Sequence, residues 1–143
     1  MIPLIVPDVN VMLSGTTISG HAPSQIIQAW RRDEIHVATS EPILEDLRRA
    51  FTYPKVTKFT KMTDDEVENY IDLLRASATV VPGSTPVKIS PDSDDDKLFS
   101  CAIEANANYI VSMDKKHVLS VSEYKGVKTM HPTEFVGEVL KLR

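Results

Sequence analysis

Short apolar runs alternate with amphipathic stretches along the chain. Five runs are rich in β-branched residues, as buried strands are, and the stretches between them repeat apolar residues at helical spacing. Strands that alternate with helices favour a parallel sheet with helices on both faces. We therefore expect an α/β protein, three-layer α/β/α with a central, mainly parallel sheet. The expected strands are 2–6, 35–38, 78–82, 109–112 and 127–130.

Capping signals indicate where several helices begin. Ser24 and Ser40 can each cap a helix, and Thr63-Asp64-Asp65-Glu66 has the form of a capping box. The Pro-, Ser- and Asp-rich stretch 83–94 is typical of a surface loop. The expected helices run from Ser24 to about Arg32, from Ser40 onward, from Thr63 through Leu74, over 95–106 and over 133–141.

Length and composition fit one ordinary globular unit. The 143 residues are 42% hydrophobic and 25% charged, and we find no internal repeat or long linker, so we expect a single domain over 1–143. No apolar run approaches the roughly 20 residues of a membrane span, and the N-terminus lacks a basic leader. A cytoplasmic protein without a membrane contact is expected. The one cysteine, Cys101, excludes an internal disulfide and a Cys-rich zinc site.

The charge balance leaves the partner open. A formal net charge of −4 argues weakly against a protein that coats nucleic acid. Five cations nevertheless fall close together and could form a rim that faces phosphate, although an ordinary solvated surface explains them equally well. They are Arg48, Arg49, Lys55, Lys58 and Lys61.

Two aspartates follow predicted strands. Asp8 comes directly after the first strand, and Asp114 follows the run 109–113. Ligands of parallel sheets gather at the carboxyl ends of the strands, so these two carboxylates are expected at the binding edge. One such aspartate is weak evidence, because aspartates also cap helices; two at equivalent strand ends are more informative.

Helical register separates the acids of the run 92–96, some of which serve only as caps. At about 100° per residue, the apolar stripe of the following helix is centred near Asp95, with Asp94 and Asp96 on either side. A buried carboxylate is costly unless a partner or cation stabilises it. Asp95 is therefore the chosen site residue, with Asp96 in reserve.

In the helix from Ser40, Asp46 borders the apolar stripe, whereas Glu45 points nearer to solvent. Asp46 is either a site residue or an ordinary surface acid. Carboxylate oxygens without a converging His or Cys suit hard cations such as Mg²⁺ or Mn²⁺. The histidines show no ligand spacing, and neither a nucleophile elbow nor a phosphate-binding glycine loop is present. The histidines are His21, His36, His117 and His131.

Four segments, in order and spacing, resemble the motifs of PIN domains, and the resemblance covers nearly the whole chain. It is closest to the subgroup described as toxin components of toxin–antitoxin systems (VapC-like). The segments are Pro7-Asp8-Val9-Asn10-Val11-Met12, Ser40-Glu41-Pro42-Ile43-Leu44-Glu45-Asp46-Leu47-Arg48-Arg49, Asp92-Ser93-Asp94-Asp95-Asp96-Lys97-Leu98 and Tyr109-Ile110-Val111-Ser112-Met113-Asp114-Lys115.

The resemblance implies an endoribonuclease that uses Mg²⁺ or Mn²⁺ to activate water at an RNA phosphodiester. It also implies a cognate antitoxin and a homodimer. The catalytic acids would be Asp8, Asp46, Asp95 and Asp114; the metal ligands Asp8, Asp95 and Asp114, with Asp96 in reserve; the hydrogen-bonding supports Asn10 and Ser112; and the RNA-binding residues Arg48, Arg49 and Lys115.

Three departures from the family pattern leave a second hypothesis open. Asp46 stands where Glu is usual, Ser112-Met113-Asp114 replaces Thr-Gly-Asp, and Lys116 occupies a position that is often acidic. The alternative is a catalytically degenerate PIN-like module that binds RNA or a protein. A receiver-like phospho-acceptor is disfavoured, because it needs paired acids near the first strand and only Asp8 stands there.

Overall fold

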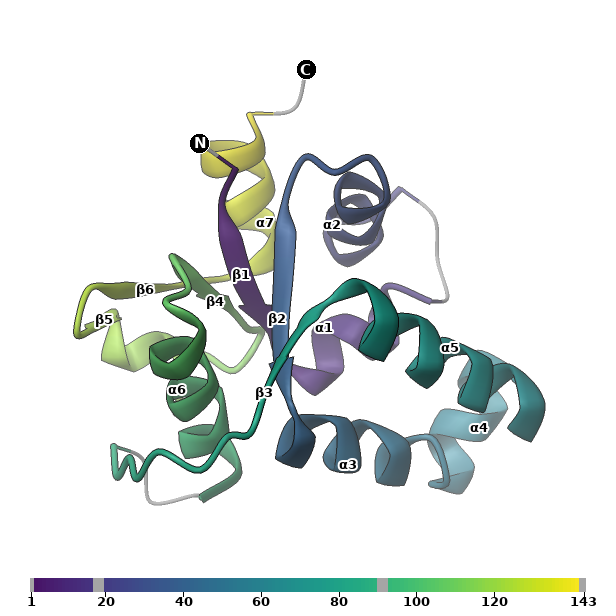
Figure 1. Cartoon of the computed structure of the whole chain (residues 1–143). Coiled ribbons are helices and arrows are strands. Elements are labelled where there is room, and N and C mark those ends of the chain that lie inside the picture. The colour runs from purple at the N-terminus through teal and green to yellow at the C-terminus, as the bar shows by residue number, and fades with distance from the viewer. Residues whose placement is uncertain (1, 17–19, 90–92, 142–143) are drawn as a thin grey trace.

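A single six-stranded sheet runs through the computed structural model, which describes residues 2–16, 20–89 and 93–141, the side chains of 93 and 94 excepted. The strand order is β3-β2-β1-β4-β6-β5, and every neighbouring pair is parallel except β5 and β6 (Figure 1). The fold is therefore α/β with a mainly parallel sheet, as expected. The strands are β1 Leu4–Pro7, β2 His36–Ser40, β3 Thr79–Val81, β4 Tyr109–Val111, β5 Glu123–Tyr124 and β6 Val127–Met130.

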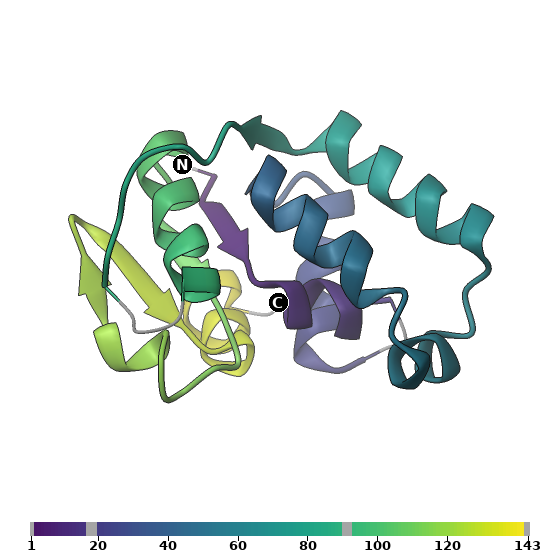
Figure 2. The ribbon, with the colours of Figure 1, turned by 90° about the horizontal axis from the view of Figure 1, so that it is seen from below.

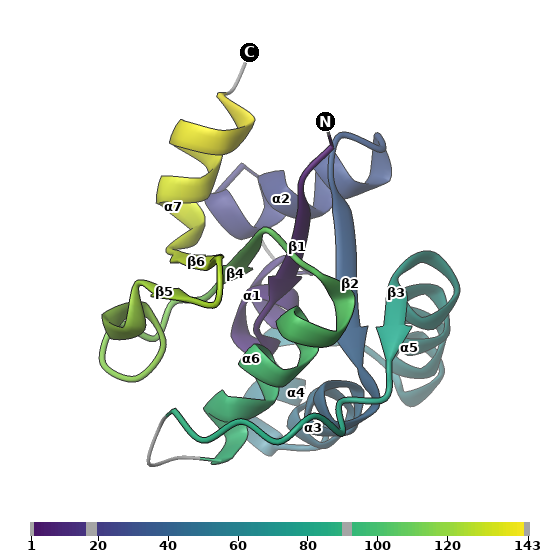
Figure 3. The ribbon, with the colours of Figure 1, turned by 60° about the vertical axis from the view of Figure 1, so that its left-hand side comes forward.

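Helices cover both faces of this sheet and complete the three layers. One core packs α1, α3, α5 and α6 against the strands, and a second packs α2, α7 and η2 on the opposite face (Figure 3). Together α3, α4 and α5 extend to one side of the sheet (Figure 2). The helices are α1 Val9–Ser14, α2 Ala22–Arg31, α3 Glu41–Ala50, α4 Pro54–Thr60, α5 Asp64–Ser77, α6 Ser93–Ala105, α7 Pro132–Phe135, the 3-10 turn η1 Leu119–Val121 and the π-helical turn η2 Val136–Leu140.

Caps explain where several of these helices begin. Ser40 caps α3, and Thr63 with Glu66 forms the expected capping box of α5. The expected cap Ser24 is wrong: Ser24 lies inside α2, and the side chain of His21 accepts its backbone N–H at 3.3 Å. The hydroxyl of Ser24 instead accepts the N–H of Gly20 at 3.3 Å. Neither α1 nor α4 was expected from the sequence.

The stretch expected to be a loop lies along a helix for part of its length. Residues 83–89, here called the strap, are fastened to α6, 90–92 lie outside the described residues, and 93–94 belong to α6 rather than to the expected loop. Glu104 accepts the N–H groups of Gly83 and Thr85 at 2.7 and 2.6 Å. Ser100 donates to the Thr85 carbonyl at 2.8 Å, and Asp96 accepts the N–H of Ile89 at 3.0 Å. Three successive turns of α6 thus hold the strap.

None of the helices in the described part of the chain has both the length and the apolarity to cross a membrane.

Gly83, at the start of the strap, is a position where only glycine fits. Its φ is +72°, and a Cβ there would lie 2.9 Å from Cδ of Pro42 and 3.0 Å from Cβ of Ser40. Gly126 also has a positive φ, +86°, but a Cβ there would meet nothing within 4 Å. We expect Gly126→Ala to lower the free energy of unfolding by about 1 kcal/mol through backbone strain alone.

Gly83→Ala should lower the free energy of unfolding by about 3 kcal/mol, because the close contact of the new Cβ with Pro42 adds to the same backbone strain. Urea denaturation of both variants measures the difference, and equal losses would show that the strap moves away from α3 without cost.

Candidate active site

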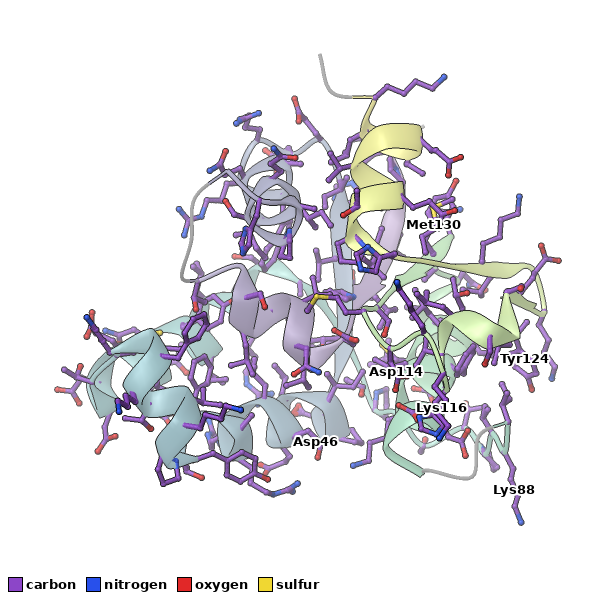
Figure 4. The ribbon with its side chains drawn as sticks, turned by 180° about the vertical axis from the view of Figure 1, so that it is seen from behind. Asp46, Lys88, Asp114, Lys116, Tyr124 and Met130 are labelled. Carbon is purple, nitrogen blue, oxygen red and sulfur yellow. The ribbon has the colours of Figure 1, made fainter. Side chains whose placement is uncertain are left out.

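One pocket gathers acids from four separate parts of the chain. Asp8 follows β1 directly, Asp46 lies in α3, Asp95 lies in the first turn of α6, and Asp114 stands three residues after β4. Figure 4 shows Asp46 and Asp114 on the same side of the molecule, with Lys116 beside Asp114. The structure thus places around one pocket all four acids that the sequence singled out. Also on the pocket wall are Val9, Asn10, Ile43, Arg49, Ala50, Tyr53 and Leu98.

Asp8 is the buried member of this group, with 8% of its surface exposed. One carboxylate oxygen caps α1 by accepting the N–H of Val11 at 2.8 Å, and the other accepts the hydroxyl of Ser112 at 2.6 Å. Burial raises the pKa of Asp8 in spite of these hydrogen bonds, and the nearby charge of Asp114 raises it further. A cation beside Asp8 would therefore stabilise its ionised form.

Ser112 links Asp8 to the segment that carries Asp114. Its side chain is fully buried; the hydroxyl donates to Asp8 and accepts the backbone N–H of Asp114 at 3.0 Å. The ends of the two central strands are thereby held together at the level of the acids. Asn10, the other residue expected to support the acids, is exposed at the pocket wall.

Asp114 sits at the start of a tight turn. Its Oδ1 accepts the backbone N–H groups of Lys116 at 3.1 Å and of His117 at 3.0 Å. The His117 hydrogen bond is the main reason that the pKa of Asp114 is lowered, so this acid stays ionised at neutral pH. Two neighbouring acids, Asp8 and Asp114, thus have pKa values moved in opposite directions.

His117 lies at this site, although its spacing in the sequence did not indicate a ligand. Its Nδ1 is 3.4 Å from Oδ2 of Asp114 and 3.9 Å from Oδ2 of Asp95. One donor atom from each of the three residues lies within 4.8 Å of the other two. The signal that could have found it is its position three residues after Asp114, which a single turn brings alongside that carboxylate.

Asp46 is held by two cations. Lys97 of α6 lies 2.9 Å from Oδ2 of Asp46, and Arg49 of α3 lies 3.1 Å from Oδ1. The Lys97 contact joins residues 51 positions apart and bridges α3 to α6 beside the pocket. Lys97 was not singled out from the sequence, because nothing in its local pattern predicts this contact.

The remaining predicted residues lie in different surroundings. Asp96 fastens the strap, and it is not among the described residues that line the pocket. Arg48 is directed to Glu68, whose carboxylate lies 3.2 Å from its Nε, whereas Arg49 lines the pocket. Lys115 is exposed next to Asp114. The three lysines of the expected phosphate-facing rim, Lys55, Lys58 and Lys61, are exposed in and just after α4.

The donors around Asp114, which include His117 beside the pocket, fit a divalent cation. Asp95 and Asp114 each offer a carboxylate oxygen within 4.8 Å of a ring nitrogen of His117, and Asp8, which lies outside this group of three, lines the same pocket as the two acids with a buried carboxylate whose pKa is raised. Carboxylates suit hard cations, and imidazole suits transition metals.

Comparison with known proteins gives a family for the whole arrangement. The model of the PIN domain matches residues 5–116, a range that contains all four acids. No curated protein matches the chain. Among solved structures, the fold resembles the crystal structure of VapBC2 from Rickettsia felis bound to a DNA fragment from their promoter. That match has a TM-score of 0.56 and 11% identity, and covers 88% of this chain and 96% of that one. This structural likeness concerns the fold alone, but the family match covers most of the sequence: the chain belongs to the PIN domain family.

Proposed function

We propose that the protein is a divalent-metal-dependent endoribonuclease that hydrolyses RNA phosphodiester bonds. The observation that carries this proposal is the convergence of Asp8, Asp46, Asp95 and Asp114 on one pocket from four separate elements. One of them, Asp8, is buried where its charged form is disfavoured, so a bound cation at that point would stabilise the carboxylate. Membership of the PIN domain family supports the same chemistry.

Three of the four acids would bind the metal ion at the scissile phosphate. Asp8, Asp95 and Asp114 would hold Mg²⁺ or Mn²⁺, and such an ion activates water and polarises a phosphate. Ser112 keeps the Asp8 carboxylate in place through its 2.6 Å hydrogen bond. Water adds to phosphorus, the bond from phosphorus to the leaving oxygen breaks, and that oxygen takes up a proton.

Asp46 would act on the phosphate indirectly, by positioning two cations. Its carboxylate lies against Lys97 and Arg49 at 2.9 and 3.1 Å, so it holds two cations beside the pocket. Those cations offset the negative charge that RNA brings to a site already rich in carboxylates.

Arg49 and Tyr53 offer a place for the RNA next to the acids. Tyr53 lines the pocket with 50% of its surface exposed, so a base can stack on its ring. Lys115 would contact the backbone on the Asp114 side. Arg48, paired with Glu68, is a weaker candidate than the sequence suggested.

We further propose that the nuclease is the toxin of a toxin–antitoxin pair, forms a homodimer and acts in the cytoplasm. The likeness of its fold to the VapBC2 structure, together with its family, supports this role.

We expect a neighbouring reading frame to encode a protein that binds this one and suppresses RNA cleavage. RNA cleavage measured with and without the purified protein from that reading frame tests the role, and an unchanged cleavage rate would contradict it.

A second candidate function is a degenerate module that binds RNA or protein without cleaving it. The observation in its favour is Lys116, an exposed cation two residues after Asp114. The two functions differ in whether the acids bind metal, so metal titration and RNA cleavage separate them.

Removing one acid should abolish cleavage and leave the fold intact. We expect Asp8→Asn and Asp114→Asn each to cleave RNA at least about 100-fold more slowly with Mn²⁺, because each change removes a ligand of the ion. Asp64→Asn, in the exposed first turn of α5, is the matched control and should keep full activity. Initial rates on labelled RNA, with and without chelator, measure the effect; wild-type rates in Asp8→Asn would refute the assignment.

Metal should also stabilise the fold. At a Mn²⁺ concentration about 100 times the Kd, the free energy of unfolding should rise by about 2.7 kcal/mol. Asp8→Asn should reduce that gain, whereas Asp64→Asn should not. Thermal unfolding across a Mn²⁺ titration gives the answer, and a flat titration for the wild type would favour the degenerate module.

The Ser112 hydrogen bond should contribute stability that depends on pH. It lowers the pKa of Asp8, opposing the rise that burial causes, so its contribution is present while Asp8 is ionised and is lost as pH falls through the raised pKa of Asp8. We expect Ser112→Ala to lower the free energy of unfolding by about 2 kcal/mol at pH 7, and by less as the pH is lowered.

Ser100→Ala is the matched control, because the Ser100 hydroxyl donates to a neutral carbonyl, that of Thr85. The free energy of unfolding that is lost in Ser100→Ala should not vary with pH. Urea denaturation in the presence of chelator, at several pH values, compares the two variants. If the free energy of unfolding lost in Ser112→Ala is also independent of pH, the Ser112 hydroxyl does not stabilise the ionised form of Asp8.

A further inference from the structure

We infer that His117 supplies a nitrogen ligand to the cation of the proposed active site, which shifts the preference of the site from Mg²⁺ toward Mn²⁺ and Co²⁺. The inference rests on the proposed metal dependence and adds to it a donor of a different kind. The carboxylate positions of the sequence motifs do not include His117, and only the folded chain brings it to the acids.

The spacing of the donors suits one ion. An octahedral ion with bonds of about 2.1 Å has adjacent donors about 3.0 Å apart and opposite donors about 4.2 Å apart. Nδ1 of His117 lies 3.4 Å from Asp114 Oδ2 and 3.9 Å from Asp95 Oδ2, between these two values. Small side-chain adjustments would therefore be enough for the three residues to share a cation.

The same distances are within the range of an ion pair but long for a charge-assisted hydrogen bond. A charge-assisted hydrogen bond from imidazolium to carboxylate has a donor–acceptor distance of about 2.7–2.9 Å. Nδ1 lies beyond that range from both carboxylates. The imidazole therefore stands near the acids at a distance that a cation can bridge.

The backbone holds the residue that carries this imidazole next to Asp114. Asp114 Oδ1 is engaged by the N–H groups of Lys116 and His117, which leaves Oδ2 as the oxygen nearer the ring. The next residue, Val118, is fully buried in the core, and its N–H donates to the Asp114 carbonyl at 3.2 Å. The turn 114–118 is thus anchored at both ends, while the His117 side chain keeps 36% of its surface exposed and can be reached by an ion from solvent.

A nitrogen donor changes which metals the site prefers. The affinity of nitrogen-containing sites rises from Mn²⁺ to Co²⁺, whereas Mg²⁺ favours oxygen ligands and water. Removing the imidazole should therefore weaken Mn²⁺ and Co²⁺ binding by about 10-fold or more and change Mg²⁺ binding by no more than about threefold.

Pulsed electron paramagnetic resonance of the Mn²⁺-loaded full chain tests the nitrogen directly. We expect ¹⁴N modulation in the wild type, and the ¹⁵N pattern after labelling with ¹⁵N-histidine. The modulation should disappear in His117→Ala and persist in His36→Ala, a change of an exposed histidine at the start of β2. The wild-type labelling experiment stands even if His117→Ala does not fold. Titrations with Mn²⁺, Co²⁺ and Mg²⁺ give the affinity changes.

The outcomes separate this inference from the proposed function. Mn²⁺ that binds in an Asp8-dependent way without nitrogen modulation, or with modulation that survives in His117→Ala, overturns the role of His117 and leaves the nuclease proposal standing. Equal losses of Mg²⁺ and Mn²⁺ affinity in His117→Ala overturn the claimed shift in preference. Failure of the wild type to bind Mn²⁺, or binding that is unchanged in Asp8→Asn, overturns the metal site itself.

Discussion

A single buried hydroxyl, that of Ser112, joins the two central strands at the point where both end. It donates to Asp8 and accepts the N–H of Asp114, so the ends of β1 and β4 and the acids that follow them share one small hydrogen-bond network. The parallel register of these strands, with Pro7 opposite Val111, makes the network reachable. Asp8 also caps α1, and the first helix therefore begins at an atom of the candidate site. The contacts that begin α1 and join the two strand ends are therefore also the contacts that position Asp8 and Asp114.

Charge balance shapes the other half of the pocket. The Asp46 carboxylate on α3 is matched by Lys97 and Arg49, so this acid adds little net negative charge. Asp8 and Asp114 are balanced differently: burial and the nearby charge of Asp114 raise the pKa of Asp8, while backbone amides lower the pKa of Asp114. The pocket therefore combines acids that burial and repulsion make receptive to a cation with two cations, Lys97 and Arg49, held close by through Asp46.

Much of the architecture was predictable because it follows from local periodicity. The alternation of strands and helices gave the three-layer arrangement, and helical register distinguished Asp95 from Asp96: the first lines the pocket and the second holds the strap. The short helices were missed for physical reasons. In α1 the apolar residues Val9, Val11, Met12 and Leu13 span too few turns to show a period, and α4 buries none of its residues. The contacts of Lys97 and His117 depend on distances across the fold, which spacing along the chain does not encode.

The strap has a consequence for how this chain can vary. Asp96, Ser100 and Glu104 recur every four residues and fasten one side of α6 over three turns. Contacts along the length of a helix oppose its rotation about its axis, and a rotation by one residue, about 100°, would replace Asp95 at the pocket with a neighbour. Surface segments usually accept insertions and deletions readily. In this protein a change of length within 83–89 would break some of the hydrogen bonds to α6, so natural variation there should favour substitutions that preserve the chain length.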